Sequence, residues 1–289
     1  MLATPIVVTQ LAHISLSFVD TVMVGRLGPA SLAGVALGNT VFFNTLIFCM
    51  GVLMAVGPMV SHAFGAHDDE AVGRSVRQGM WLAASLSIPA FAFIYHGGFF
   101  LSMLGQTPEN VASAGAYLRA IGWGIFPFLG FIALRSFVEA VSRPKAVTVI
   151  AIFGVGLNIG LNYILMFGKM GFPEMGLVGT GWASTCVYSF NFLVLLAYAG
   201  WQKAFKEYHI FSKLGRPDGH YFNELFRIGW PIGASIGIET SLFMATVIMM
   251  GWIGTSQLAA HQVAVQCAAF TFMVPLGIGM ATSVRVGQA

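Results

Sequence analysis

The sequence has very little charge. Of its 289 residues only 9% are Asp, Glu, Lys or Arg, whereas 57% are hydrophobic, and the mean hydropathy is +0.79. Soluble domains carry about 25% charged residues, so this composition excludes an ordinary soluble protein. Stretches of about 20 apolar residues, enough to cross a hydrocarbon core about 30 Å thick, recur along the chain. We therefore predict an all-α polytopic membrane protein with about eight transmembrane helices, near residues 3–24, 39–63, 77–99, 118–141, 146–167, 178–200, 229–252 and 262–284.

Cysteine and catalytic motifs are also scarce. The three cysteines, Cys49, Cys186 and Cys267, lie inside predicted spans without CxxC or CxxH spacing, so we expect neither a disulfide framework nor a metal site. The sequence has no Walker A motif, no HExxH and no GxSxG. We therefore do not expect an enzyme, a cofactor or nucleotide-driven chemistry, and any uphill work would have to draw on an ion gradient.

The few basic residues are distributed unevenly. Ten lie in loops after the even-numbered spans and three lie on the opposite side. The ten are Arg74, Arg77, Arg143, Lys145, Lys203, Lys206, Lys213, Arg216, Arg227 and Arg285, and the three are Arg26, Arg119 and Lys169. The positive-inside rule then predicts a multi-pass protein of the plasma (inner) membrane with its N-terminal end in the cytoplasm. Basic loops of this kind indicate contact with membrane lipids and not with nucleic acid.

The chain contains an internal repeat. Shifting the sequence by 226 residues pairs Pro5 with Pro231 and Ala63 with Ala289 without a gap, and 15 of the 59 pairs are identical. Six predicted spans separate the copies, and because six is even, both copies enter the membrane from the same side. This is the pattern of a parallel repeat about an axis along the membrane normal.

The repeat predicts the domain organisation. We expect an N-terminal lobe of six helices at 1–200, a cytoplasmic linker at 201–227, and helices 7 and 8 of a second lobe at 228–289. A protein with two complete copies would have roughly 450 residues, so we expect this chain to be the N-terminal part of a longer one.

An aspartate interrupts the first span. In SLSFVDTVMVG, residues 15–25, Asp20 lies about five residues from the predicted outer end of an apolar helix. Intramembrane acids are costly and normally face a cavity or a partner, so Asp20 is a functional candidate. On the fifth span Asn158 and Asn162 lie one turn apart, and Asn162 has nearly the depth of Asp20. We expect these three groups to converge. The alternative is that the asparagines only join helices by hydrogen bonds.

Other polar residues can extend this network. His13 lies two turns before Asp20 on the same helix face and can titrate near neutral pH, although a neutral, hydrogen-bonded histidine is the simpler alternative. Gln10 can line the same cavity. Glu239 occupies the repeat position of His13, near mid-membrane, and is the second strong candidate. The sixth span begins with three hydroxyl residues, Thr180, Ser184 and Thr185, although such groups readily bond to their own helix.

These features together indicate a secondary transporter, and the sequence resembles the multidrug and toxic compound extrusion (MATE) antiporters. The resemblance spans essentially all 289 residues and rests on FVDTVMVGRLGPASLAGVALGN, AFGAHDDEAVGRSVRQG, NIGLNYILMFG, GWPIGASIGIET and IGTSQLAAHQVAVQ. It implies twelve helices in two lobes around a central cleft, and export of organic cations or drugs in exchange for H+ or Na+. It also implies a monomer, with small-molecule cations as its ligands.

The resemblance carries over to individual residues. It implies that Asp20 matches the first-helix acid of the family, Asn158 and Asn162 its fifth-helix polar pair, Thr185 a sixth-helix hydroxyl and Glu239 its seventh-helix acid. Many members have glutamine at the position of His13, and some have aspartate at that of Asn162, so the coupling ion stays open between H+ and Na+.

Two other readings remain. One is a flippase of lipid-linked precursors in the same superfamily, which would be expected to line its cleft with more cationic groups, whereas the basic residues here are concentrated in loops. The other is an ion channel or an intramembrane enzyme, which would need a ring of filter groups or a catalytic set.

Overall fold

The computed structural model describes residues 3–103, 105, 108–210, 218–253 and 255–288, which form helices joined by short loops and contain no strand. The helices are α1 (Ala3–Gly25), α2 (Pro29–Leu53), α3 (Val56–Gly65), α4 (Asp69–Tyr95), α5 (Gly97–Met103), α6 (Pro108–Gly122), α7 (Ile125–Ala140), α8 (Pro144–Phe167), α9 (Gly176–Trp201), the 3-10 helix η1 (Lys203–Phe205), α10 (Gly219–Ile253) and α11 (Thr255–Gln288).

The all-α membrane fold is confirmed. By length and composition, six helical segments of the described part can cross a membrane, and α6 with α7 form a further span that is bent by 50°. The predicted span at 229–252 lies inside the 35-residue helix α10. This helix begins at Gly219, so the last part of the predicted linker at 201–227 is helical.

Two predicted spans are interrupted. The span predicted at 39–63 consists of α2 and α3, and the one predicted at 118–141 consists of α6 and α7. In both cases a proline, Pro58 or Pro127, is the third residue of the helix after the break. Proline has no amide hydrogen to donate to the preceding turn but fits the first turn of a helix. The interruptions therefore fall directly before these prolines.

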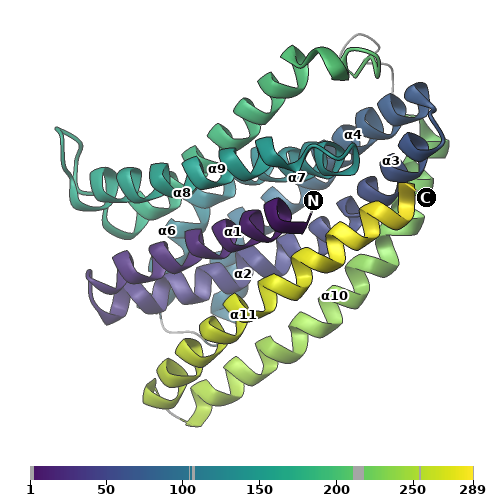
Figure 1. Cartoon of the computed structure of the whole chain (residues 1–289). Coiled ribbons are helices and arrows are strands. Elements are labelled where there is room, and N and C mark those ends of the chain that lie inside the picture. Colours follow the sequence, from purple (N-terminus) through teal and green to yellow (C-terminus); the bar gives the residue numbers. More distant parts are fainter. Residues whose placement is uncertain (1–2, 104, 106–107, 211–217, 254, 289) are drawn as a thin grey trace.

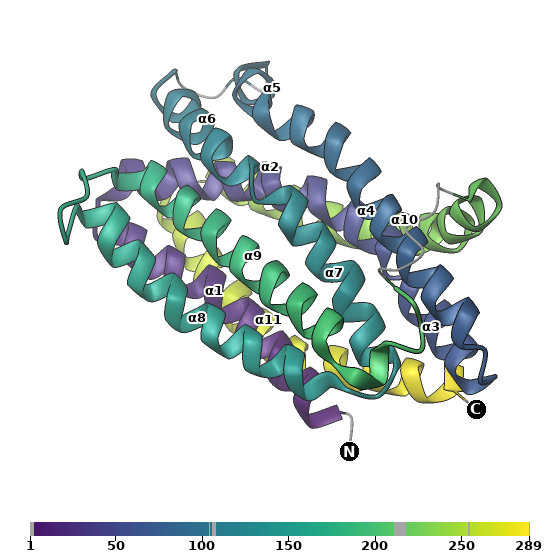
Figure 2. The same cartoon turned by 90° about the horizontal axis from the view of Figure 1, so that it is seen from above.

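The helix that carries Asp20 lies in the middle of the assembly. Helix α1 packs against α8 and α9, which also pack against each other, while α7 lies between α4 and α9 (Figure 2). Helices α10 and α11 run side by side along α2 and α1 (Figure 1). The approach of α10 to α2 is close, because a Cβ atom on Gly51 would overlap the backbone of Gly233.

Candidate functional site

Asp20 sits in a polar pocket formed by three helices. Its side chain, on the last turns of α1, is 8% exposed. Asn162 on α8 donates its Nδ2 to Asp20 Oδ1 at 2.6 Å, and Ser184 on α9 donates its Oγ to Asp20 Oδ2 at 3.1 Å. Asn162 Nδ2 also reaches Asn158 Oδ1 at 3.1 Å. The predicted convergence of Asp20, Asn158 and Asn162 is confirmed.

Local sequence brings these helices together. Pro144 opens α8 in its first turn, where proline is well tolerated, and the four-residue spacing stacks the two asparagines on one face. On α9, Gly179 lies so close to α8 that a Cβ atom there would be 2.7 Å from the Leu165 carbonyl carbon. The absence of a side chain at Gly179 allows α9 to approach α8 and places Ser184 within reach of Asp20.

No described residue donates a hydrogen bond to two buried side-chain oxygens, Oδ1 of Asn162 itself and Oγ1 of Thr180, which lies a turn before Ser184 on α9. Buried polar atoms of this kind are costly unless a ligand or water satisfies them. Carboxylate, amide and hydroxyl oxygens are the ligands that hard cations prefer. No group of three or more His, Cys, Asp or Glu residues in the described part of the chain could hold a metal ion.

Thr185 does not contact Asp20. Its hydroxyl donates to the carbonyl oxygen of Ala120 on α6 at 2.9 Å, whereas the neighbouring Ser184 reaches the carboxylate. Consecutive residues of a helix point about 100° apart, so only one of the two can face α1. The sixth-span hydroxyl nearest to the acid is therefore Ser184.

Gln10 and His13 belong to a separate polar cluster on α1. Arg135 on α7 donates its Nη2 to Gln10 Oε1 at 2.6 Å and its Nε to Glu139 Oε1 at 2.8 Å. The ring of His13 packs edge-on against Phe131, with 5.9 Å between the ring centroids. Neither Arg135 nor Glu139 was singled out from the sequence, although their four-residue spacing on an apolar helix is the signal of an internal ion pair.

Glu239 lies elsewhere in the structure. It is an exposed residue of α10, the helix that packs against α2, and it is not part of the Asp20 pocket. The structure therefore brings together Asp20, Asn158 and Asn162, and it places Gln10 and His13 near Arg135. Thr185 of α9 bonds to α6 instead, and Glu239 lies apart on α10.

The combination of a polar pocket around an intramembrane acid and an all-helical fold agrees with the family comparison. The family model described as MatE matches residues 5–164 and 231–289. The chain belongs to the MATE family. The members of this family are membrane transporters and not enzymes.

The most informative relatives are bacterial. The chain is 43% identical over 288 residues to a probable multidrug resistance protein NorM of Bradyrhizobium diazoefficiens, and 40% identical over 290 residues to one of Mesorhizobium japonicum. In both cases all of this chain aligns with 62% of the relative, so the chain spans somewhat less than two thirds of their length.

Solved MATE structures share the fold. The eukaryotic MATE transporter AtDTX14 superposes with a TM-score of 0.88 at 21% identity over 99% of this chain and 63% of that protein. An outward-facing multidrug resistance MATE transporter gives 0.84 at 22% identity, over 98% of this chain and 62% of its own. At such identities the likeness establishes the architecture of the helices and nothing about their ligands.

Proposed function

We propose that the protein is a secondary antiporter that exports organic cations or drugs in exchange for H+ or Na+. The observation that carries the proposal is Asp20, a buried acid of a membrane helix whose two oxygens accept hydrogen bonds from Asn162 and Ser184. Membership in the MATE family and the multidrug resistance names of its bacterial relatives support the same direction. The proposed ligands are small organic cations, which complement an acid in the membrane.

The proposed mechanism uses the charge of Asp20. A carboxylate inside the membrane is costly even with two neutral donors, so a cation that reaches it is stabilised there. The bound cation changes the relative free energies of the inward-facing and outward-facing states, because the two states differ in how they enclose the acid. Cation and drug would then occupy the binding region in turn during alternating access.

Both coupling ions fit the chemistry of the pocket. Na+ would use the oxygens of Asp20 together with Asn162 Oδ1 and Thr180 Oγ1, which lack donors among the described residues. A proton on Asp20 would instead turn one carboxylate oxygen into a donor, for which Asn162 Oδ1 is a buried acceptor. The two ions therefore differ in their need for Thr180, because only Na+ would use its oxygen directly.

We propose that the protein lies in the inner membrane with its N-terminal end on the cytoplasmic side. The ten-to-three distribution of basic residues supports this orientation.

The test is export of a cationic dye by the complete gene product in liposomes, with a pH gradient or a Na+ gradient imposed separately. Asp20→Asn keeps the shape of the side chain and removes its charge, so coupled export should be lost while the protein still inserts. Glu70→Gln, which changes an exposed acid at the start of α4, is the control and should export normally. Wild-type export by Asp20→Asn under both gradients would refute the proposal. Thr180→Val should impair Na+-driven export only.

A further inference from the structure

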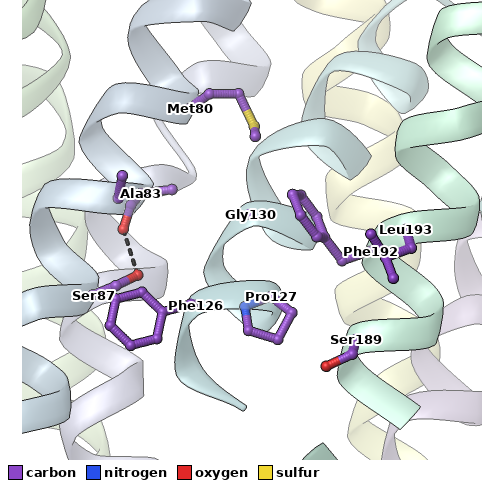
Figure 3. A pocket seen from close by; sticks show the side chains of 10 residues that line it. Met80, Ala83, Ser87, Phe126, Pro127, Gly130, Ser189, Phe192 and Leu193 are labelled. Atoms are coloured by element: carbon purple, nitrogen blue, oxygen red, sulfur yellow. Dashed lines mark hydrogen bonds between the residues drawn. The ribbon is translucent and has the colours of Figure 1, made fainter. Parts of the chain in front are cut away.

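A groove of about 380 Å³ lies between α4, α7 and α9. Helix α7 forms its floor, and α4 and α9 form its walls (Figure 3). Figure 3 shows Met80 at one end, Phe126 and Ser87 at the other, and Phe192 and Leu193 along the α9 side. The residues of the proposed antiport mechanism do not line it.

The groove offers hydrocarbon contacts and few hydrogen bonds. The small side chains of Ala83 and Ala84 leave space on the α4 wall, while at Gly130 the ring of Phe192 packs directly against the floor. Its two serines are engaged within their own helices, since Ser87 donates to the Ala83 carbonyl at 2.6 Å and Ser189 donates to the carbonyl one turn before it at 2.8 Å. An occupant therefore gains burial of apolar surface and needs no polar group inside the groove.

Aromatic residues lie at one end of the groove, and a basic residue lies one turn beyond the other end. Phe126 packs against Phe91, with 5.6 Å between the ring centroids, and Phe91 packs against Trp123 at 4.9 Å. At the opposite end, Met80 lies one turn from Arg77 on the same face of α4. From Arg77 to Ser87 the helix rises by roughly 15 Å, which is half of a hydrocarbon core about 30 Å thick.

Arg77 is anchored to the segment that follows α9. Its Nη1 donates to the backbone carbonyl of His209 at 3.0 Å, an uncharged acceptor. The amide of His209 in turn bonds to the carbonyl of Lys206, whose side chain is exposed, as is that of Lys203 in the same segment. The exposed carboxylate of Glu207, next to Lys206 in the chain, offsets one of the two positive charges of Lys203 and Lys206. The carboxylate of Glu70 lies 3.4 Å from the neighbouring Arg74 and also acts on Arg77 through its charge.

We propose that the groove between α4, α7 and α9 binds one anionic phospholipid from the leaflet on the side of the basic loops, with an acyl chain against Ala84 and Gly130 and its phosphate at Arg77. Three observations select this occupant: the groove is apolar, the rise from Arg77 to Ser87 matches one acyl chain from headgroup to mid-membrane, and the basic Arg77 lies one turn beyond the Met80 end. The site is additional to the antiport function and would persist if that function were assigned wrongly.

The first experiment measures lipid retention. The complete gene product is equilibrated in detergent with equal amounts of phosphatidylglycerol and phosphatidylcholine that have the same acyl chains. The lipid that stays bound is identified and quantified by native mass spectrometry. The wild type should retain one phosphatidylglycerol in preference. Arg77→Gln should lower that preference about fivefold, the effect of one basic residue near an anionic headgroup. Arg77→Lys should keep the preference, and Arg74→Gln is the matched control that should leave it unchanged.

The second experiment tests the chain-binding part of the groove. Ala84→Trp fills the space between α4 and α9, so it should lower retention of both lipids. Ala92→Trp, the same substitution at an exposed position of α4 that does not line the groove, should leave the retention unchanged. Equal retention of the two lipids by the wild type, or no loss with Ala84→Trp, would mean that only bulk lipid covers the groove and would overturn the proposal.

A competition experiment separates lipid from a transported cation. Phosphatidylglycerol with a photoactivatable acyl chain should label the groove, and unlabelled phosphatidylglycerol should compete while tetraphenylphosphonium should not. If tetraphenylphosphonium displaces the label and phosphatidylglycerol does not, the groove is a site for lipophilic cations and the lipid assignment is wrong. Asp20→Asn should leave the labelling unchanged, so failure of the antiport proposal and failure of this one can be told apart.

Discussion

The buried ion pair between Arg135 and Glu139 provides a quantitative test of the packing inside the N-terminal helices. The two side chains are 7% and 4% exposed, and 2.8 Å separates Nε of Arg135 from Oε1 of Glu139. Glu139→Leu would leave the guanidinium buried with only the neutral Gln10 oxygen, which lies at 2.6 Å. Removing one partner of a buried pair destabilises a protein by about 3–5 kcal/mol, and we expect this loss in the free energy of unfolding.

The double variant should behave differently. Arg135→Met together with Glu139→Leu leaves no buried charge, and replacing a whole buried pair by apolar residues is often neutral. The remaining cost is the lost hydrogen bond to Gln10, about 1 kcal/mol. We therefore expect the double variant to be more stable than Glu139→Leu alone.

An exposed pair with the same spacing is the control. Arg74 and Glu70 are 3.4 Å apart with side chains 40% and 63% exposed. Glu70→Leu should cost less than about 1 kcal/mol, because water screens this pair. Unfolding would be followed by denaturing-detergent titration of the purified protein in micelles, with helicity as the signal. The reasoning is wrong if Glu139→Leu costs no more than Glu70→Leu. It is also wrong if the stability losses of Arg135→Met and Glu139→Leu, measured separately, add up to the loss of the double variant, because the pair would then not be internally compensated.

Three further predictions test the orientation, the pocket and the contact between α2 and α10. In a cysteine-free background, Glu174→Cys should react with an impermeant external thiol reagent and Lys206→Cys should not; the reverse pattern would refute the orientation. Ser184→Ala removes a donor to a carboxylate and should slow coupled export about tenfold, whereas Ser189→Ala should have no effect; equal rates would remove Ser184 from the mechanism. Gly51→Val places a side chain against the backbone of α10 and should cost about 2 kcal/mol of unfolding free energy in micelles, and unchanged stability would contradict that close contact.

The sequence was sufficient to predict the membrane helices but not all of their interruptions. Hydropathy averages over about 20 residues, so it reports that residues 118–141 can cross a membrane and is insensitive to a local break. The 50° bend before Ile125 depends on where the chain places Pro127 and its missing amide hydrogen. Proline also occurs inside an unbroken helix, as Pro89 within α4 shows, so its presence alone does not identify a break.

The pairing of Asp20 with Asn162 could be predicted because it depends only on depth and on a one-turn spacing. Which sixth-span hydroxyl joins them could not, since Ser184 and Thr185 differ only in the rotation of α9 about its axis. That rotation is set by the close approach of Gly179 to α8, a tertiary contact that periodicity does not reveal. Likewise, the repeat relates Glu239 to His13 by position in the chain, but the two residues have different surroundings.

The buried charged residues in the described part of the chain form two sites, Asp20 on α1 and the Arg135–Glu139 pair on α7. These sites differ in whether the charge is compensated. Arg135 and Glu139 neutralise each other at 2.8 Å, so a further ion near them would have to disrupt a compensated pair. Both oxygens of Asp20 instead accept hydrogen bonds from neutral donors, Asn162 and Ser184, which stabilise its charge without cancelling it. Binding of a proton or a metal cation therefore lowers the free energy of this carboxylate, and the stabilisation is lost when the ion leaves. The antiporter proposed above needs a charge that is alternately compensated and released, so Asp20 fits the coupling role proposed for it. The compensated Arg135–Glu139 pair, which bonds to Gln10 on α1, fits a structural role instead.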